Sequence, residues 1–540
     1  MRHTTRQIDR RAFLTVAGAA GIWPLLDSPV FAQATSGQTV DTTLGKVRGR
    51  LHTGIHAFKG IPYGASTGGA KRFMAPANAA PWTGVREAVR YGHQSPQNMR
   101  FTEVLAPQAD PAEGFDEDCL NLNVWTPGVN DGRKRPVMFW CHGGGFAQES
   151  GSWPWIDGES LARRGDAVVV TVNHRLTVFG YLHLADVGGA KYAASGNAGM
   201  LDLVLALQWV RDNIASFGGD PGNVLIFGES GGGAKVCTLL TMPAAKGLFH
   251  RAAIQSGANL RSVTRDAADA STKALLDRLQ VRADRIDTLQ TMPTARILEA
   301  IAAARGGGPG PGGPMNFAPV MDGSILPTHP FDPVASPVSA TVPLLVGCTA
   351  QEQTLFALTD ESAFTLDDAA LRNRVERVVG GLNVERVLAT YRKAHPRETP
   401  SGLYFLISTD RGMRMNAIRL SERKVMQAQA PVYMYLFAWQ SPALDGRLRA
   451  THTVEIPFVF DNTQIPKTMT AGGAEVQALA AQTSEAWIAF ARTGNPNHKA
   501  LPTWPAYTTA QRATMVFDAP ASKVVNDPGR AERELWASLG

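Results

Sequence analysis

The sequence predicts an α/β protein in which helices cover both faces of a mostly parallel central sheet. Three observations support this fold class. Short apolar runs recur along the 540-residue chain, helical patterns separate them, and one run leads directly into Gly228-Glu229-Ser230-Gly231-Gly232. Near-continuous apolar runs are typical of strands buried on both faces. Strands that alternate with helices favour right-handed crossovers between parallel strands.

The expected elements follow in chain order. Residues 40–50 predict a short strand or hairpin, and the Gly-, Ala- and Pro-rich residues 60–81 predict a loop. The apolar runs predict strands at residues 136–141, 167–172, 224–227, 342–346 and 432–437.

Helices are expected at residues 201–214 and 266–305, where apolar residues recur with helical spacing. The second helical region ends at a glycine- and proline-rich stretch, residues 306–314, which can hold neither helix nor strand and is expected to be a surface loop. We expect the helices between Ser230 and Glu352 to form a cap over the site, not a separate domain.

Residues 1–34 are expected to be an export signal, and residues 35–540 a single large domain. The stretch Asp9-Arg10-Arg11-Ala12-Phe13-Leu14 resembles a twin-arginine signal, and the weakly apolar segment after it is too short and glycine-rich to span a bilayer. Cleavage is expected after Ala32 or Ala34. Such a signal sends a folded protein to the bacterial periplasm or beyond. The alternative is a basic tail that contains an arginine pair.

Composition excludes other function classes. The net charge of +6 is mild and dispersed, which argues against a nucleic-acid partner. No segment after the signal is long and apolar enough for a membrane span. The four cysteines lack the short spacing of a metal site and are expected to be buried small hydrophobic residues. We expect no metal and no organic cofactor.

Ser230 is the candidate nucleophile. An apolar run precedes it and a small-residue segment follows it, which is the strand, sharp turn and helix context that gives G-x-S-x-G its meaning. The turn exposes the hydroxyl at the strand end, and the amides of the next helix stabilise negative charge beside it.

A serine nucleophile needs a histidine base and a carboxylate that orients the base. In α/β-hydrolases these groups follow the order Ser, acid, His along the chain. Glu352 stands just past one expected strand and His452 follows another, so this pair is the candidate acid and base. The competing histidines precede the acid or lie among charged, loop-like residues: His250, His329, His395 and His498.

A glycine-rich stretch supplies candidate donors for an oxyanion. His142-Gly143-Gly144-Gly145-Phe146 follows the strand that ends at Cys141 and is of the H-G-G-G type. Glycines let backbone amides approach the developing charge without a Cβ atom in the way. We expect Gly144, Gly145 and Gly231 to be the donors.

Two long motifs, at residues 117–125 and 217–223, stand in order before Ser230, and shorter ones follow at 319–323, 455–458 and 493–497. Together they resemble the signatures and landmarks of the type B carboxylesterase family, which includes the cholinesterases, over most of the mature chain. The resemblance implies an α/β-hydrolase fold and serine ester hydrolysis on a small-molecule ester. It also implies that Ser230, Glu352 and His452 are the triad.

The resemblance further implies supporting roles around the histidine for Glu229, Ser256 and Glu455. Without it, Glu229 would be a turn residue and Ser256 a core hydroxyl.

The sequence departs from the family pattern at four places. Gln351 and Gln353 flank the acid where the family usually has Asp or Asn before it and Gly after it, and Thr453 follows the histidine where a small residue such as Gly is usual. Ser95 replaces the usual cysteine partner of Cys119, so Cys119 is expected to be unpaired. Ala109 replaces the cholinesterase tryptophan, which argues against a quaternary-ammonium site.

Two other functions remain open at this point. One is hydrolysis of an amide or a carbamate by the same triad. The other is a non-catalytic, cholinesterase-like binding protein, although such relatives lose the nucleophile or the base. The expected assembly is a monomer or a weak homodimer.

Overall fold

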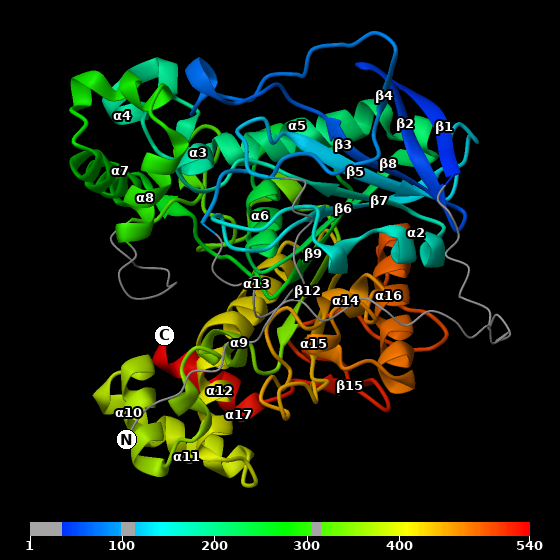
Figure 1. The fold of residues 1–540 in the computed structure, drawn as a ribbon. Helices are drawn as coiled ribbons and strands as arrows, with labels where there is room; N and C mark the ends of the chain where they lie inside the picture. The colour runs from blue at the N-terminus through cyan, green and yellow to red at the C-terminus, as the bar shows by residue number, and fades with distance from the viewer. Residues whose placement is uncertain (1–34, 99–113, 305–314) are drawn as a thin grey trace, which may run out of the picture.

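The computed structural model describes residues 35–98, 114–304 and 315–540, which form a 13-stranded sheet with helices around it. The strand order is β1-β2-β3-β5-β7-β6-β8-β9-β12-β13-β14-β15, and β4 pairs with β2 beside this path. Figure 1 shows the blue strands β1 to β4 at one end and the red β15 at the other. The strands are β1 Thr35–Thr42, β2 Gly45–His52, β3 Ile55–Pro62, β4 Val85–Glu87, β5 Asn121–Thr126, β6 Arg135–Cys141, β7 Val168–Val172, β8 Gly219–Glu229, β9 Arg251–Gln255, β12 Leu344–Thr349, β13 Val432–Phe437, β14 Ala513–Phe517 and β15 Lys523–Asn526.

The centre of the sheet is parallel and its ends are antiparallel, except that β4 pairs parallel with β2. Every pair from β7 to β14 runs parallel. The hairpin β1–β2, the strands β3 and β5 and the last strand β15 pair antiparallel. A separate two-stranded sheet joins β10 (Val263–Thr264) to β11 (Val320–Met321). The predicted mostly parallel central sheet is confirmed.

Most helices lie between strands in the sequence, as the sequence predicts. They are α2 Glu159–Gly165, α3 Thr177–Tyr181, α4 Ala185–Gly188, α5 Ala198–Asn213, α6 Gly231–Leu239, α7 Arg265–Leu279, α8 Thr294–Ala304, α9 Gln353–Ala357, α10 Asp368–Val379, α11 Val384–Ala394, α12 Pro400–Thr409, α13 Met415–Val425, α14 Ile456–Val459, α15 Lys467–Thr470, α16 Ala474–Thr493 and α17 Arg530–Leu539.

The central strands are buried on both faces, which explains their near-continuous apolar runs. Val137 and Phe139 of β6 pack with α5 and α6 in one core cluster, whereas Met138 and Trp140 pack with α16 in the other. Successive side chains of a strand point to opposite faces, so β6 supplies both cores. All seven residues of β6 are buried.

The predicted helical region at 266–305 is three shorter pieces. The structure places α7, a 3₁₀ segment at Ala283–Gln290 and α8 there. Helices α9 to α13 form a second helical block between β12 and β13, which the sequence analysis did not predict. Figure 1 places α7 and α8 beside α3 and α4, away from α10, α11 and α12. The cap role of the first block stays a prediction.

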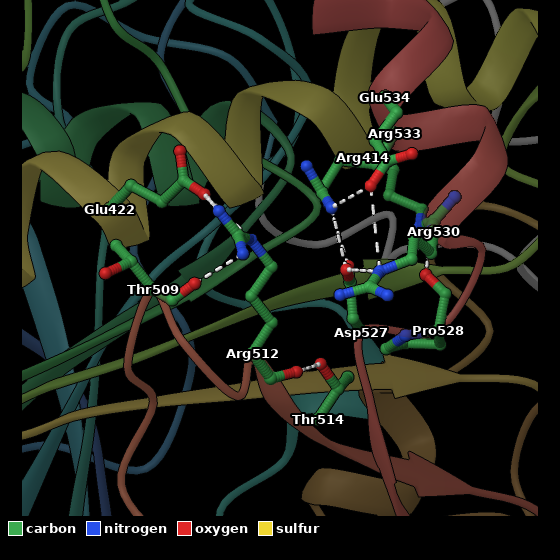
Figure 2. Close-up of polar contacts among 10 residues, drawn as sticks. All are labelled: Arg414, Glu422, Thr509, Arg512, Thr514, Asp527, Pro528, Arg530, Arg533 and Glu534. Carbon is green, nitrogen blue, oxygen red and sulfur yellow. Dashed lines mark hydrogen bonds and ion pairs between the residues drawn. The ribbon is translucent and has the colours of Figure 1, made fainter.

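A group of charged residues, here called the C-terminal ion cluster, joins the end of the chain to α13 (Figure 2). It comprises Arg414, Glu422, Arg512, Asp527, Arg530, Arg533 and Glu534. Arg533 donates two 2.7 Å hydrogen bonds to the two oxygens of Asp527. Arg512 donates to Glu422 Oε1 at 3.0 and 2.8 Å. These pairs tie α17 to the β14–β15 hairpin, and that hairpin to α13.

Several sequence predictions lie outside the described residues: the export signal at 1–34, its cleavage after Ala32 or Ala34, Ala109, and the loop at 306–314. Among the residues that are described, no helix combines the length and apolarity needed to cross a bilayer. Cys119, Cys141, Cys237 and Cys348 are all buried and free, as predicted. Ser95 stands where the family pattern places a second cysteine, and its Oγ accepts a hydrogen bond from the Leu176 amide at 3.0 Å.

Candidate active site

Ser230 stands on a sharp turn between β8 and α6. Its backbone angles, φ 55° and ψ −121°, lie outside the regions that most residues adopt. The turn packs against the end of β6: a Cβ atom at Gly228 would lie 2.5 Å from the Cys141 carbonyl oxygen, and one at Gly232 would lie 2.0 Å from it. Only glycine fits at these two positions, so the turn holds Ser230 at the carboxyl end of the parallel strands.

The predicted acid and base are in direct contact. Glu352 follows β12, and its Oε2 accepts a short hydrogen bond from His452 Nδ1. Its other oxygen, Oε1, accepts from the Thr349 amide at 2.8 Å. The Glu352 and His452 side chains are both almost fully buried, at 0% and 3% exposed. A carboxylate at Nδ1 holds the proton of the neutral ring there and leaves Nε2 free to accept one.

The loops that carry the acid and the base are joined. The Gln351 amide donates to the Ala450 carbonyl at 3.0 Å, and Gln351 Oε1 accepts from the Ala450 amide at 3.2 Å. Thr354 Oγ1 donates to the Leu448 carbonyl at 2.7 Å. Gln351, which departs from the family pattern, therefore links the acid's loop to the segment just before His452.

His452 Nε2 faces Glu229, the residue before Ser230. The Nε2 atom lies 3.3 Å from Glu229 Oε1. Among the hydrogen bonds that the described residues form, none joins Ser230 Oγ to His452. Hydrogen bonds to a nucleophile are often long or poorly aligned until substrate binds, so this arrangement leaves the triad possible.

The competing histidines have other partners. Their contacts are Val224 N to His250 Nδ1, Ser262 N to His329 Nδ1, His395 Nε2 to Glu532, and His498 Nε2 to the Gln482 carbonyl. His452 is therefore the best placed of these candidates.

The three predicted oxyanion glycines lie against one another. We call residues 142–149 the oxyanion loop. A Cβ atom at Gly231 would fall 2.4 Å from the Gly145 nitrogen and 2.1 Å from its oxygen, so the loop packs directly on the first residue of α6. Gly144 and Gly145 have φ of 70° and 64°, which glycine adopts without strain. The backbone of Gly145 therefore lies against that of Gly231, the residue next to Ser230.

Three buried glutamates surround His452, and we call Glu229, Glu352 and Glu455 the carboxylate cluster. Ser256 Oγ donates to Glu455 Oε1 at 3.3 Å. Burial, reinforced by the charge of Glu352, raises the pKa of Glu455 to about 7. Burial and the charges of Glu455, Glu149 and Glu352 raise the pKa of Glu229 well above its ordinary value.

Two charged residues beside the oxyanion loop escaped the sequence analysis. Lys235 lies fully buried in α6. Glu149 is the last residue of the loop. Burial raises its pKa to about 7, although the charge of Lys235 opposes this shift. The signal in the sequence was a lysine in the otherwise uncharged segment that follows Ser230.

The described residues contain one cluster with metal-ligand geometry, and it lies apart from the residues above. His183, Asp186 and Asp269 have ligand atoms within 4.8 Å of one another. The Arg265 guanidinium pairs with Asp186. An arginine beside two carboxylates and a histidine already balances part of their charge, so this cluster does not indicate a cofactor for the candidate site.

Comparisons of sequence and of structure with known proteins all match this chain to esterases and related hydrolases. A family model described as the carboxylesterase family matches residues 36–536. The para-nitrobenzyl esterase of Bacillus subtilis (strain 168) is 37% identical over 508 residues, which cover 93% of this chain and 99% of that protein. The phenmedipham hydrolase of Pseudarthrobacter oxydans is 33% identical over 504 residues, which cover 91% and 97%. A crystal structure of a Geobacillus stearothermophilus carboxylesterase superposes with a TM-score of 0.80 at 40% identity, and covers 92% of this chain and 99% of that one.

Proposed function

The chain belongs to the carboxylesterase family, carboxylic ester hydrolases of the α/β-hydrolase fold, and from this premise we propose that it cleaves small-molecule esters through a Ser230–His452–Glu352 triad. The contact between His452 Nδ1 and Glu352 carries the proposal, because it leaves Nε2 as the base beside the turn that exposes Ser230.

The proposed reaction has two halves. His452 Nε2 takes the Ser230 proton while the serine oxygen attacks the ester carbonyl, and the amides of Gly144, Gly145 and Gly231 hold the resulting oxyanion. His452 then gives the proton to the leaving alcohol, and an acyl-enzyme remains on Ser230. Water repeats the sequence and releases the acid. The residues named supply the nucleophile, the base and the charge stabilisation without a metal or an organic cofactor.

Glu229, Ser256 and Glu455 are proposed to act on His452 and not on substrate. Glu229 Oε1 lies 3.3 Å from Nε2, and it must yield that position to the Ser230 hydroxyl when substrate binds. Ser256 holds Glu455 next to the Glu352–His452 pair. This geometry supports the supporting roles that the family resemblance implies.

Labelling with a fluorophosphonate probe tests the nucleophile. The wild-type protein should be labelled on the peptide that contains Ser230, and it should hydrolyse p-nitrophenyl acetate. Ser230→Ala should lose the label and at least about 10,000-fold in kcat. Near-normal hydrolysis by Ser230→Ala would overturn the assignment, and an unlabelled, inactive wild-type protein would favour a non-catalytic binding role.

Matched substrates separate ester hydrolysis from the alternatives with the same triad. We compare an ester, an anilide and a carbamate that share one acyl or aryl group. The ester should have by far the highest kcat/KM, because an amide nitrogen must be protonated before it leaves. If the carbamate or the anilide were cleaved as fast as the ester, the protein would be a carbamate or amide hydrolase with the same triad.

We also propose that residues 1–34 export the protein to the bacterial periplasm or outside the cell, and that residues 35–540 form one domain that is a monomer or a weak homodimer. The arginine pair at Arg10 and Arg11 supports the export route. Cell fractionation tests this route. The wild-type protein should be found in mature form in the periplasm, whereas an Arg10→Lys, Arg11→Lys variant should remain in the cytoplasm as the uncleaved precursor.

A further inference from the structure

Lys235 points its ammonium group at the backbone of the oxyanion loop. The side chain is completely buried in α6, five residues after Ser230. Its Nζ donates to the carbonyls of His142 at 2.8 Å, Gly143 at 3.2 Å and Gly145 at 2.9 Å. An ammonium group has three hydrogens to donate, so these three carbonyls use all of them.

The bond to the Gly143 carbonyl bears on the Gly144 amide. The carbonyl of residue 143 and the N–H of residue 144 belong to one planar trans peptide and point in opposite directions. If Lys235 holds the carbonyl side toward α6, the Gly144 N–H must point away from Lys235. Gly144 is one of the proposed oxyanion donors, so its direction depends on Lys235.

The peptide that follows is fixed in another way. The Gly144 carbonyl accepts from the Ala147 amide at 3.2 Å and the Gln148 amide at 3.1 Å, which fixes the peptide that carries the Gly145 N–H. The Gly143 carbonyl has one other partner among the described residues, His142 Nδ1 at 3.2 Å. The lysine and the His142 ring therefore hold the peptide between Gly143 and Gly144 together.

Several titratable groups surround the ammonium group of Lys235. The groups that interact electrostatically with Lys235 are Cys141, His142, Glu149, His174 and Glu229. Burial lowers the pKa of Lys235 to about 8, and Cys141, Glu149 and Glu229 oppose that shift. A cation on the carbonyl side also polarises the peptide, which strengthens the N–H on the other side as a donor.

We propose that Lys235 is a positioning residue for the oxyanion hole, which acts by holding the Gly143 carbonyl so that the Gly144 amide faces the developing oxyanion. The inference rests on the proposed ester hydrolysis and adds a residue that the triad and the three glycines do not include.

Lys424 provides a matched control. It is a second buried lysine that donates to backbone carbonyls, those of Ser339 at 2.7 Å and Ala340 at 2.8 Å, and burial also lowers its pKa to about 8. Its partners lie outside the oxyanion loop. Replacing it removes the same kind of interaction from a part of the chain with no proposed role in the reaction.

The experiment compares Lys235→Met with Lys424→Met in the full chain. For Lys235→Met we expect kcat for p-nitrophenyl acetate to fall about tenfold to a hundredfold, less than the loss of a whole oxyanion donor, with little change in KM. A trifluoromethyl ketone that forms a tetrahedral adduct with serine should bind more weakly by a similar factor. Lys424→Met should keep kcat and inhibitor affinity within about twofold, whatever its Tm.

Unchanged kcat and inhibitor affinity in Lys235→Met would overturn the proposal. Lys235→Gln and Lys235→Arg, which keep donor groups, should retain more activity than Lys235→Met; equal losses in all three would indicate packing alone. If no Lys235 variant folds while Lys424→Met does, Lys235 is a folding determinant and the proposal fails. An inactive wild-type protein would instead count against ester hydrolysis itself.

Discussion

The carboxylate cluster and the C-terminal ion cluster both hold acidic side chains, but they pair them differently. In the C-terminal ion cluster each glutamate or aspartate faces an arginine, as Asp527 faces Arg533. Partial burial alone would raise the pKa of Asp527, yet the hydrogen bonds and charge of Arg533 hold that pKa below its ordinary value. In the carboxylate cluster three buried glutamates share one histidine, and the pKa values of Glu229 and Glu455 are raised.

The difference separates stability from reactivity. Removing one partner of a charge pair leaves the other uncompensated, which destabilises the folded state. Buried like charges raise the free energy of the folded state at neutral pH, and they persist where a site needs an oriented histidine. We therefore expect substitutions in the carboxylate cluster to change activity more than stability, and substitutions in the C-terminal ion cluster to do the reverse.

The same change, Glu to Gln, made once in each cluster gives the largest contrast. Glu352→Gln keeps the shape of the acid but cannot hold the Nδ1 proton of His452 in the same way. We expect kcat/KM for p-nitrophenyl acetate to fall about 1,000- to 10,000-fold, with a Tm within a few degrees of wild type. Stopped assays and differential scanning calorimetry measure both quantities on one preparation.

Glu422→Gln is the matched control for that variant. It weakens the two hydrogen bonds from Arg512 and should lower the free energy of unfolding by about 1 kcal/mol while kcat/KM stays near wild type. If Glu422→Gln lost activity as strongly as Glu352→Gln, the two clusters would not differ as we infer.

The raised pKa of Glu455 predicts a pH-dependent effect of intermediate size. A carboxyl whose pKa is about 7 when folded and near 4.5 when unfolded binds a proton more tightly in the folded state. Its contribution to stability is therefore full below about pH 4.5 and is lost as the pH rises to 7. Glu455→Gln removes this loss, so it should stabilise the protein by about 1–3 kcal/mol more at pH 8 than at pH 5.

Urea unfolding at the two pH values measures this difference. Glu534→Gln, an exposed residue of the C-terminal ion cluster, should show no such rise between pH 5 and pH 8. A Glu455→Gln variant whose stability gain is the same at both pH values would indicate that Glu455 is already ionised in the folded protein.

The sequence predicted most of the central strands, but it missed β9 (Arg251–Gln255), which lies between β8 and β12. The runs at 136–141 and 432–437 correspond to β6 and β13 because burial on both faces leaves an uninterrupted apolar pattern. Strand β5 was missed because it contains buried asparagines. Asn123 accepts from the Gly60 amide at 2.9 Å and donates to the Gly151 carbonyl at 3.2 Å, so its polar groups are satisfied by distant loops that no local pattern reveals.

Some residues of the candidate site could be predicted from the sequence, and others could not. Ser230 could be predicted because the strand, the turn and the helix around it are local in sequence. Glu352 and His452 are 100 residues apart, and only their order and the family resemblance linked them before the structure placed them in contact. Lys235 could not be assigned, because its role depends on carbonyls of a loop about 90 residues earlier.

We expect the smallest effect on stability and activity from a substitution at Thr453, which departs from the family pattern beside His452. Its φ of 71° lies in the left-handed region, which favours glycine, a small residue of the kind usual at this place in the family. Its Oγ1 is buried and has no hydrogen-bond partner among the described residues. Thr453→Gly removes both unfavourable features but adds backbone freedom to the unfolded chain, so we expect a net gain of about 1 kcal/mol in the free energy of unfolding. Chemical denaturation measures it, and kcat should change less than threefold because the His452–Glu352 contact is untouched. A destabilised variant would mean that the Thr453 side chain contributes packing that outweighs its backbone strain.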